Sequence, residues 1–211
     1  MKNVVGGDDE QARPQKLNSN HIERFSAMKN ALFLLLTILP AWANAEVRQQ
    51  TIFDNTINSL CCGYVVGLYP SSSDVYIDTF PFTVQGSSYQ LREVSLLASG
   101  AAPGGLSLFL YEDAGGKPGA VLESWQGVSA GSTVSRITTN SVKRPILEDG
   151  KQYWFGVSTT NPSETAIWWI NPGAAVSAAC SFANGTLLPC LNSLATGAFT
   201  ISGMPLPGNF H

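Results

Sequence analysis

The chain has 211 residues, of which 44% are hydrophobic and 13% are charged, and its formal net charge is −3. The charges from Glu46 onward are scattered, so no basic stripe is available to neutralise phosphates, and no nucleic-acid partner is expected. The only histidines are His21, in the N-terminal lead, and His211, the last residue. This leaves no imidazole for a Ser-His-Asp site or a His-containing zinc site. We therefore predict a non-catalytic protein with no catalytic residue, no metal site and no cofactor.

The N-terminal part of the chain predicts export. Met28 opens a short charged segment, an apolar run follows over 31–39, and small residues at 43 and 45 precede a cleavage position. This order is typical of a secretory signal peptide over 28–45, cut after Ala45. The apolar run is too short for a membrane helix, which needs about 20 residues.

The signal peptide divides the chain into three parts. Residues 1–27 are polar and precede the signal, so they are predicted to be a mis-called or disordered extension. Residues 46–211 suit a single domain, because a chain of that length buries roughly 70% of its unfolded surface. We expect this domain to be secreted, periplasmic or displayed at the cell surface, with no membrane span after signal cleavage.

Residues 46–211 show the two-residue period of β-strands. Leu106, Leu108 and Leu110 illustrate it, and helical periodicity is absent. Short alternating segments separated by Gly, Pro, Ser and Asn recur about every ten residues, which predicts an all-β, antiparallel sandwich or barrel. The expected strands are 49–54, 64–69, 76–84, 90–98, 106–110, 121–125, 133–138, 152–158, 165–171, 174–181 and 196–202.

Carboxylates offer the remaining routes to chemistry. A glycosidase needs two acids across a cleft, and Asp or Glu oxygens in turns suit calcium. For the glycosidase candidates and for the calcium candidates alike, the preferred interpretation is a charged side chain in contact with solvent. The glycosidase candidates are Glu93, Glu112, Glu123, Glu148 and Glu164, and the calcium candidates are Asp74, Asp78, Glu112 and Asp113.

A turn is expected over 112–119. Pro118 offers the fixed φ of the second turn position and Gly119 the positive φ of the third. These residues predict a type II turn.

A second local pattern lies at 147–153, where Leu147, Gly150 and Tyr153 follow one another at three-residue spacing. In β-sandwiches this sequence pattern indicates a corner at which the chain crosses between sheets. The tyrosine ring lies inside, and its hydroxyl forms a hydrogen bond with backbone a few residues upstream. An ordinary hairpin with a buried tyrosine is the alternative.

Two tryptophans provide the only specific sign of a ligand. If Tyr153 and Phe155 face the core, Trp154 faces outward, and a hairpin about residues 161 and 162 pairs Trp154 with Trp169. Trp154 and Trp169 are then candidate ligand-binding residues that stack on sugar rings. The alternative is that a neighbouring strand, loop or partner chain covers them.

The four cysteines of the chain are Cys61, Cys62, Cys180 and Cys190. Disulfides are expected in an exported domain. Adjacent strand side chains point to opposite faces, which disfavours a bond between neighbours. We therefore predict two bridges from the Cys61-Cys62 segment to Cys180 and Cys190, with a local Cys180–Cys190 bond that leaves Cys61 and Cys62 as free thiols as the alternative.

Several of these elements, in this order, resemble the bacterial choice-of-anchor R extracellular domains. The match covers roughly residues 50–171, and its third element is the most specific. The four elements are residues 51–55; Leu91, Val94 and Leu97; the Leu108-x-Leu110-Tyr111-x-Asp113-x-x-Gly116-Lys117-Pro118-Gly119 motif; and Leu147-x-x-Gly150-x-x-Tyr153-Trp154.

The resemblance implies a jelly-roll-like β-sandwich in a cell-surface or matrix protein, with no established catalytic residues. Members usually end in a sorting segment, and the sequence at 204–211 contains none. The expected function is a structural or interaction module of the bacterial envelope or matrix, with another surface protein or a polysaccharide as partner. A carbohydrate-binding module using Trp154 and Trp169 is the alternative function.

Overall fold

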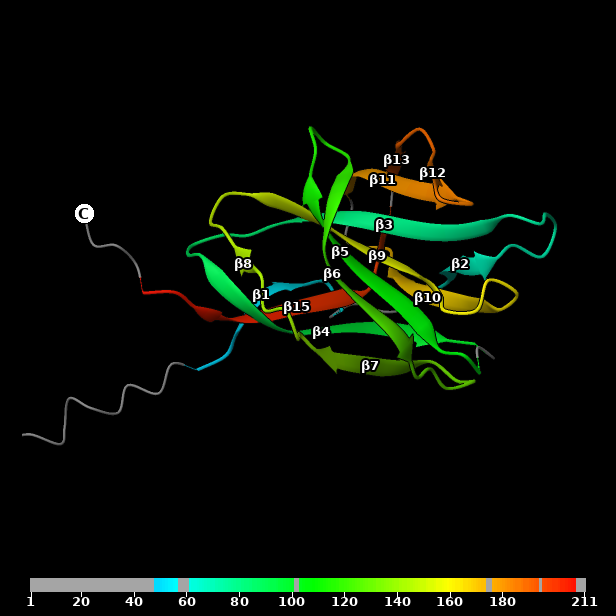
Figure 1. Ribbon diagram of the computed structural model, residues 1–211, viewed down its shortest axis with the longest axis horizontal. Helices are drawn as coiled ribbons and strands as arrows, with labels where there is room; N and C mark the ends of the chain where they lie inside the picture. The colour runs from blue at the N-terminus through cyan, green and yellow to red at the C-terminus, as the bar shows by residue number, and fades with distance from the viewer. Residues whose placement is uncertain (1–47, 57–60, 101–102, 174–175, 194, 208–211) are drawn as a thin grey trace, which may run out of the picture. The chain divides into compact units, whose positions relative to one another are not determined.

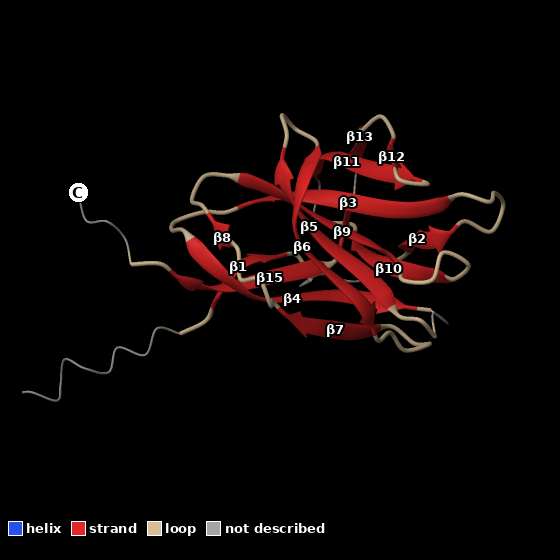
Figure 2. Cartoon of the chain, viewed as in Figure 1, coloured by secondary structure: helices blue, strands red, loops and turns tan. Residues whose placement is uncertain are grey.

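The computed structural model describes residues 48–56, 61–100, 103–173, 176–193 and 195–207. The predicted signal peptide and the 1–27 extension lie outside these residues. All regular structure in the described chain is β-strand, drawn in red in Figure 2. Every strand pairing among the described residues is antiparallel. The predicted all-β, antiparallel class is therefore confirmed. No helix of membrane-spanning length and apolarity occurs in the described part of the chain.

The strands hydrogen-bond into one strongly curled sheet that forms an open half-barrel (Figure 1). Its main path joins segments that are far apart in the sequence. In spatial order, the path contains β1 (Gln50–Asp54), β15 (Phe199–Pro205), β4 (Tyr89–Ser99), β10 (Thr165–Asn171), β2 (Gly63–Leu68), β3 (Val75–Thr83), β9 (Gln152–Thr159), β5 (Leu106–Asp113) and β6 (Pro118–Val128). We call the part of this path from β1 to β2 the first arm of the sheet and the part from β3 to β6 the second arm.

Shorter strands branch from this path. Two of them pair with β4, one pairs with β10, and the remaining three form a group beside β3. In that order they are β7 (Ser135–Asn140), β8 (Ile146–Leu147), β14 (Thr196–Gly197), β11 (Val176–Ala183), β12 (Thr186–Leu187) and β13 (Leu191–Ser193).

The main core lies on the concave side of the sheet. Alternate residues of β5 and β9 point into it, and Phe155 on β9 meets Phe199 on β15 at a ring-centroid distance of 5.0 Å. Phe82 on β3 also faces Phe199, at 6.0 Å, and Phe155 lies 5.8 Å from Trp168 on β10. Each fully buried ring contributes roughly 1.5–3 kcal/mol by leaving water. Burial of these rings therefore holds the two arms of the curled sheet together.

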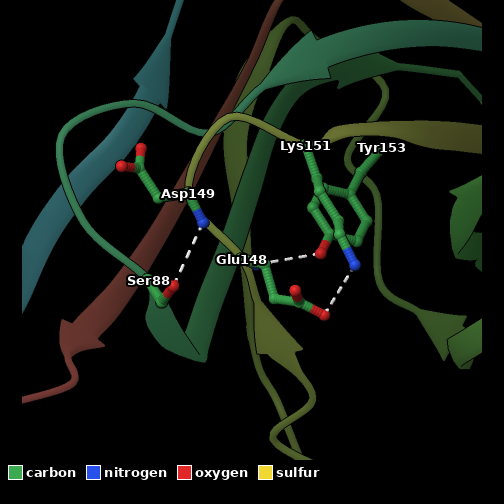
Figure 3. A network of polar contacts seen from close by, with 5 residues as sticks. All are labelled: Ser88, Glu148, Asp149, Lys151 and Tyr153. Atoms are coloured by element: carbon green, nitrogen blue, oxygen red, sulfur yellow. Dashed lines mark hydrogen bonds and ion pairs between the residues drawn. The ribbon is translucent and has the colours of Figure 1, made fainter. Parts of the chain in front are cut away.

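The tyrosine corner predicted at 147–153 is confirmed (Figure 3). Tyr153 is buried, and its hydroxyl accepts a hydrogen bond from the Glu148 backbone N–H at 2.9 Å. Gly150 has a φ of +74°, which few other residues adopt without strain. The corner connects β8, which pairs with β4, to β9, which pairs with β3 and β5. It therefore carries the chain from one arm of the sheet to the other.

The type II turn predicted at Pro118 and Gly119 is wrong. Both residues belong to β6, and positive φ values of +68° and +81° occur instead at Gly115 and Gly116. Two successive residues with positive φ are what a two-residue type I′ hairpin requires. Because the Gly115-Gly116 pair already meets this need, the turn forms before the proline.

Candidate functional site

The predicted pairing of Trp154 with Trp169 is wrong. Strand β9 lies between β3 and β5, so Trp154 stands opposite Pro81 and Tyr111. Strand β10 pairs with β2 and β4 instead, and Trp169 stands opposite Gly63. The short connection between β9 and β10 crosses from one arm to the other, so the two strands do not form a hairpin.

Trp154 faces the outer side of the sheet but is not exposed there. Its exposed fraction is 0%, and it belongs to a second apolar cluster with Tyr111 and Cys180. Side chains of β11 and β12, including Phe182, pack against this cluster. The indole N–H donates to the Asp113 carboxylate at 2.7 Å. Trp154 is therefore covered by neighbouring strands, as the alternative interpretation held.

Trp169 is half-buried, and its indole N–H donates to the Ser99 hydroxyl at 2.8 Å. With Trp154 enclosed, the two indoles do not form an outward stacking platform. The burial of Trp154 removes the outward platform on which the predicted sugar stacking depended.

The predicted bridges between the two cysteine segments are also wrong. Cys180 lies at disulfide distance from Cys190, and Cys61 lies at disulfide distance from Cys62. Cys61 and Cys62 are exposed just before β2, whereas Cys180 is buried on β11. The prediction assumed that adjacent side chains point to opposite faces of a strand. Cys61 and Cys62 precede β2, so this alternation does not apply to them.

Replacing both Cys180 and Cys190 with serine is expected to lower the free energy of unfolding by about 2–3 kcal/mol, because the bond closes a short loop in the unfolded chain. The Cys61→Ser/Cys62→Ser double variant is the matched control. It closes almost no chain and should change stability by less than about 1 kcal/mol. Urea unfolding measures both effects, and equal losses in the two variants would contradict this assignment.

A pocket lies beside the Cys180–Cys190 bond. It has a volume of about 410 Å³, within the range typical of small-molecule sites. Strand β11 alternates, so that Cys180 joins the outer cluster while its neighbours Ala179 and Ser181 face the pocket. The remaining apolar lining comes from Leu188, Pro189, Leu191 and Ala195.

The polar groups of this pocket come from four strands, of which β13 contributes Asn192. Asp78 on β3 stands opposite Ser181 on β11 in the sheet register, and the Ser181 hydroxyl donates to Asp78 Oδ1 at 2.6 Å. Tyr64 on β2 donates its hydroxyl to the Ala195 carbonyl at 3.2 Å. Its ring packs on Phe80 at 5.2 Å. The pocket thus contains one carboxylate, two hydroxyls and the Asn192 amide, and the rest of its wall is apolar.

Burial raises the pKa of Asp78 from 3.8 to about 6, although the hydrogen bond from Ser181 opposes this shift. No described Lys or Arg lies within ion-pair distance of Asp78 to favour its charged form. Asp78 was treated from the sequence as surface charge or a calcium ligand. Asp78 shares the two-residue period of Phe80 and Phe82, which face the core. That period predicts an inward-facing Asp78, and it is the sequence signal for this pocket residue.

The raised pKa of Asp78 predicts a stability that depends on pH. Between about pH 4 and pH 6 the folded state holds its Asp78 proton more tightly than the unfolded state, so stability falls as pH rises through this window. Asp78→Asn removes this cost. The variant is expected to be more stable than the parent by about 2 kcal/mol at pH 7.5, with the difference vanishing near pH 4. Denaturant unfolding at both pH values tests this, and a difference independent of pH would contradict it.

A larger hollow, of about 480 Å³, is lined by Ile52, Pro81 and Gln152 among others. Its only titratable group is Asp54, which already accepts hydrogen bonds from Thr56 and Thr200. Burial raises the pKa of Asp54, but these hydrogen bonds and the nearby Arg136 together outweigh burial, so the pKa lies below its ordinary value of 3.8. This acid is therefore satisfied internally, and the hollow is a weaker candidate.

One glutamate departs from the expected solvated charge. Glu123 on β6 is 1% exposed and accepts hydrogen bonds from the Ser141 hydroxyl and the backbone N–H groups of Val142 and Lys143. These donors follow β7, so the carboxylate joins the edge of one arm to a loop of the other. Its contacts are those of a structural anchor.

The acids proposed for calcium do not converge. Asp74 accepts from the Asn184 side chain, and Asp113 accepts from Trp154, Gln152 and Gly116. Burial raises the pKa of Asp113, but these hydrogen bonds lower it overall. Within the described residues, no group of three or more His, Cys, Asp or Glu side chains is placed to hold a metal ion.

No protein-family model matches the chain, and no curated protein matches it either. The resemblance to choice-of-anchor R domains therefore stays a prediction. The candidate site rests on the geometry of the pocket at Asp78.

Proposed function

We propose that the chain is an exported, non-catalytic binding module of the cell surface or extracellular matrix, and that the pocket at Asp78 is its recognition site. One observation carries this proposal. The pocket is preformed, lined mainly by apolar side chains, and contains a few convergent polar groups. This composition is typical of sites that bind small molecules.

The polar groups of the pocket suit recognition better than catalysis. General acid–base chemistry of the glycosidase type needs two carboxyl groups across a cleft, whereas Asp78 is the only carboxylate among the lining residues. The hydroxyls of Tyr64 and Ser181 are engaged with the Ala195 carbonyl and Asp78. The only base beside either hydroxyl is the Asp78 carboxylate, which accepts from Ser181. The lining residues include no imidazole or amine to complete a set of nucleophile, base and orienting group.

Export is supported by the paired cysteines. Both pairs lie at disulfide distance, and such bonds persist in oxidising compartments. We further propose that the two arms of the curled sheet represent a jelly-roll-like β-sandwich whose sheets are joined at one corner through β2 and β3. Recognition of a polysaccharide through paired indoles is not part of this proposal, because Trp154 is covered.

Binding is tested with the full-length chain, expressed for export and purified in its oxidised form. Screening a panel of small organic fragments by ligand-observed NMR should give compounds that bind the parent protein. Ala179→Leu fills the pocket from β11 and should remove that binding, whereas Val142→Leu, on an exposed loop residue, should leave it intact. A panel in which no compound loses binding on Ala179→Leu would overturn the pocket as the recognition site.

Export is tested separately. N-terminal sequencing of the protein recovered outside the cytoplasm should give Glu46 as the first residue, and peptide mapping without reduction should give a Cys180–Cys190 link. Recovery of an intact 1–27 segment in the mature protein would contradict the export signal.

A further inference from the structure

We propose that the pocket at Asp78 binds a small organic cation, with a primary or secondary ammonium group against the Asp78 carboxylate and a short apolar body against Leu188, Pro189 and Leu191. This inference rests on the proposed binding function and names the ligand class of the same site.

The first argument is the unbalanced charge of the pocket. Asp78 receives one hydrogen bond from the chain, at Oδ1 from Ser181, and Oδ2 has no hydrogen bond from the described residues. An ammonium ligand provides both a positive charge and N–H donors, so it satisfies the oxygen that the protein leaves without a partner. A charge-assisted hydrogen bond of this type is stronger than a neutral one.

The second argument is the apolar wall. Leu188, Pro189 and Leu191 line the pocket, and Leu191, the register partner of Ala179, is 71% exposed on β13. An apolar ligand body would cover surface that now meets water. A simple inorganic cation would leave this wall unused, and the single carboxylate is too few ligands to hold one.

The third argument is preorganisation. Asp78 and Ser181 are fixed by the pairing of β3 with β11, and β13 is held to β11 at the Ala179–Leu191 register position. The Cys180–Cys190 bond joins the same two segments, and the Tyr64 hydroxyl anchors Ala195. A pocket whose walls are already in place loses little freedom when the ligand enters.

The affinity of the pocket for an ammonium ligand should depend on pH. The pKa of Asp78 is about 6, so most of the free protein carries a neutral Asp78 at pH 5 and an ionised one at pH 7.5. Binding of an ammonium ligand should therefore strengthen about tenfold between these pH values. Binding of a neutral ligand of the same shape should not change.

The test uses benzylammonium, with benzyl alcohol as its neutral counterpart, titrated into the oxidised full-length protein and followed by NMR. At pH 7.5, Asp78→Asn should weaken benzylammonium at least tenfold and remove its pH dependence, with little effect on benzyl alcohol. Asp149→Asn, on an exposed acid, makes the same change in net charge and should leave both ligands unaffected. Ser181→Ala removes the hydroxyl that favours the ionised carboxylate, and should move the midpoint of the pH dependence upward.

The outcomes separate this inference from the proposed function. If both ligands bind equally well and Asp78→Asn changes neither, the organic-cation assignment is overturned while the binding pocket stands. If Asp149→Asn weakens benzylammonium as much as Asp78→Asn does, the attraction comes from net charge, and the assignment is again overturned. If no fragment, charged or neutral, loses binding on Ala179→Leu, the proposed function fails with it.

Discussion

Trp154→Ala is expected to lower the free energy of unfolding by about 3–5 kcal/mol, since truncating a fully buried indole leaves a large cavity. The loss has two parts. The ring packs with Tyr111 and Cys180 in the outer cluster, and its N–H donates to Asp113. Urea unfolding followed by far-ultraviolet circular dichroism measures the effect. At this magnitude the variant should melt many degrees below the parent.

Two further variants separate these parts. Trp154→Phe retains most of the ring but removes the hydrogen bond, so a loss of about 1–2 kcal/mol is expected. Tyr69→Ala removes an aromatic ring that is 42% exposed and should cost less than about 1 kcal/mol. A Trp154→Ala protein as stable as the parent would mean that the outer cluster does not enclose this ring.

Glu123→Gln is expected to cost about 3–4 kcal/mol. Oε2 accepts from Ser141 and Oε1 accepts from Val142 and Lys143, so a glutamine of the same shape keeps only one of these two acceptor oxygens. At least one buried donor is then left unpaired, and the remaining bonds lose their charge assistance. Chemical denaturation at neutral pH provides the measurement.

Glu148→Gln is the matched control, because it makes the same chemical change on an exposed side chain. Glu148 forms an ion pair with Lys151 at 2.8 Å (Figure 3), and both side chains are more than half exposed. Such pairs contribute little, so a change of less than about 1 kcal/mol is expected. If the two variants lose equal stability, the anchoring role of Glu123 is wrong.

The sequence predicted the local features of the fold better than its pairings. The alternation of Leu106, Leu108 and Leu110 correctly placed a strand with these three leucines buried, and the spacing of Leu147, Gly150 and Tyr153 correctly predicted the corner. These features depend on residues close together in the chain, where strand period and turn chemistry act directly.

The pairings could not be derived in this way. Strands β9 and β10 are separated by a short loop, and the shortest connection favours a hairpin. The structure places them in different arms, because the core is built from rings that lie far apart in sequence, such as Phe82 and Phe199. Parity correctly put Trp154 on the outer face, but it says nothing about what covers that face. The candidate pocket was missed for the same reason, since Asp78 and Ser181 meet only through the β3–β11 pairing.

The Cys180–Cys190 bond constrains both faces of the sheet at β11, because Cys180 points to one side while Ala179 and Ser181 point to the other. The bond to Cys190 therefore clamps the packing around Trp154 and, through the same few residues of backbone, the wall that faces Asp78. On the proposal that the chain is exported, a newly synthesised chain in the reducing cytoplasm would have neither constraint, and both would form together when the thiols oxidise. Under that proposal, oxidation would fix the outer cluster and the wall of the proposed ligand pocket in a single step.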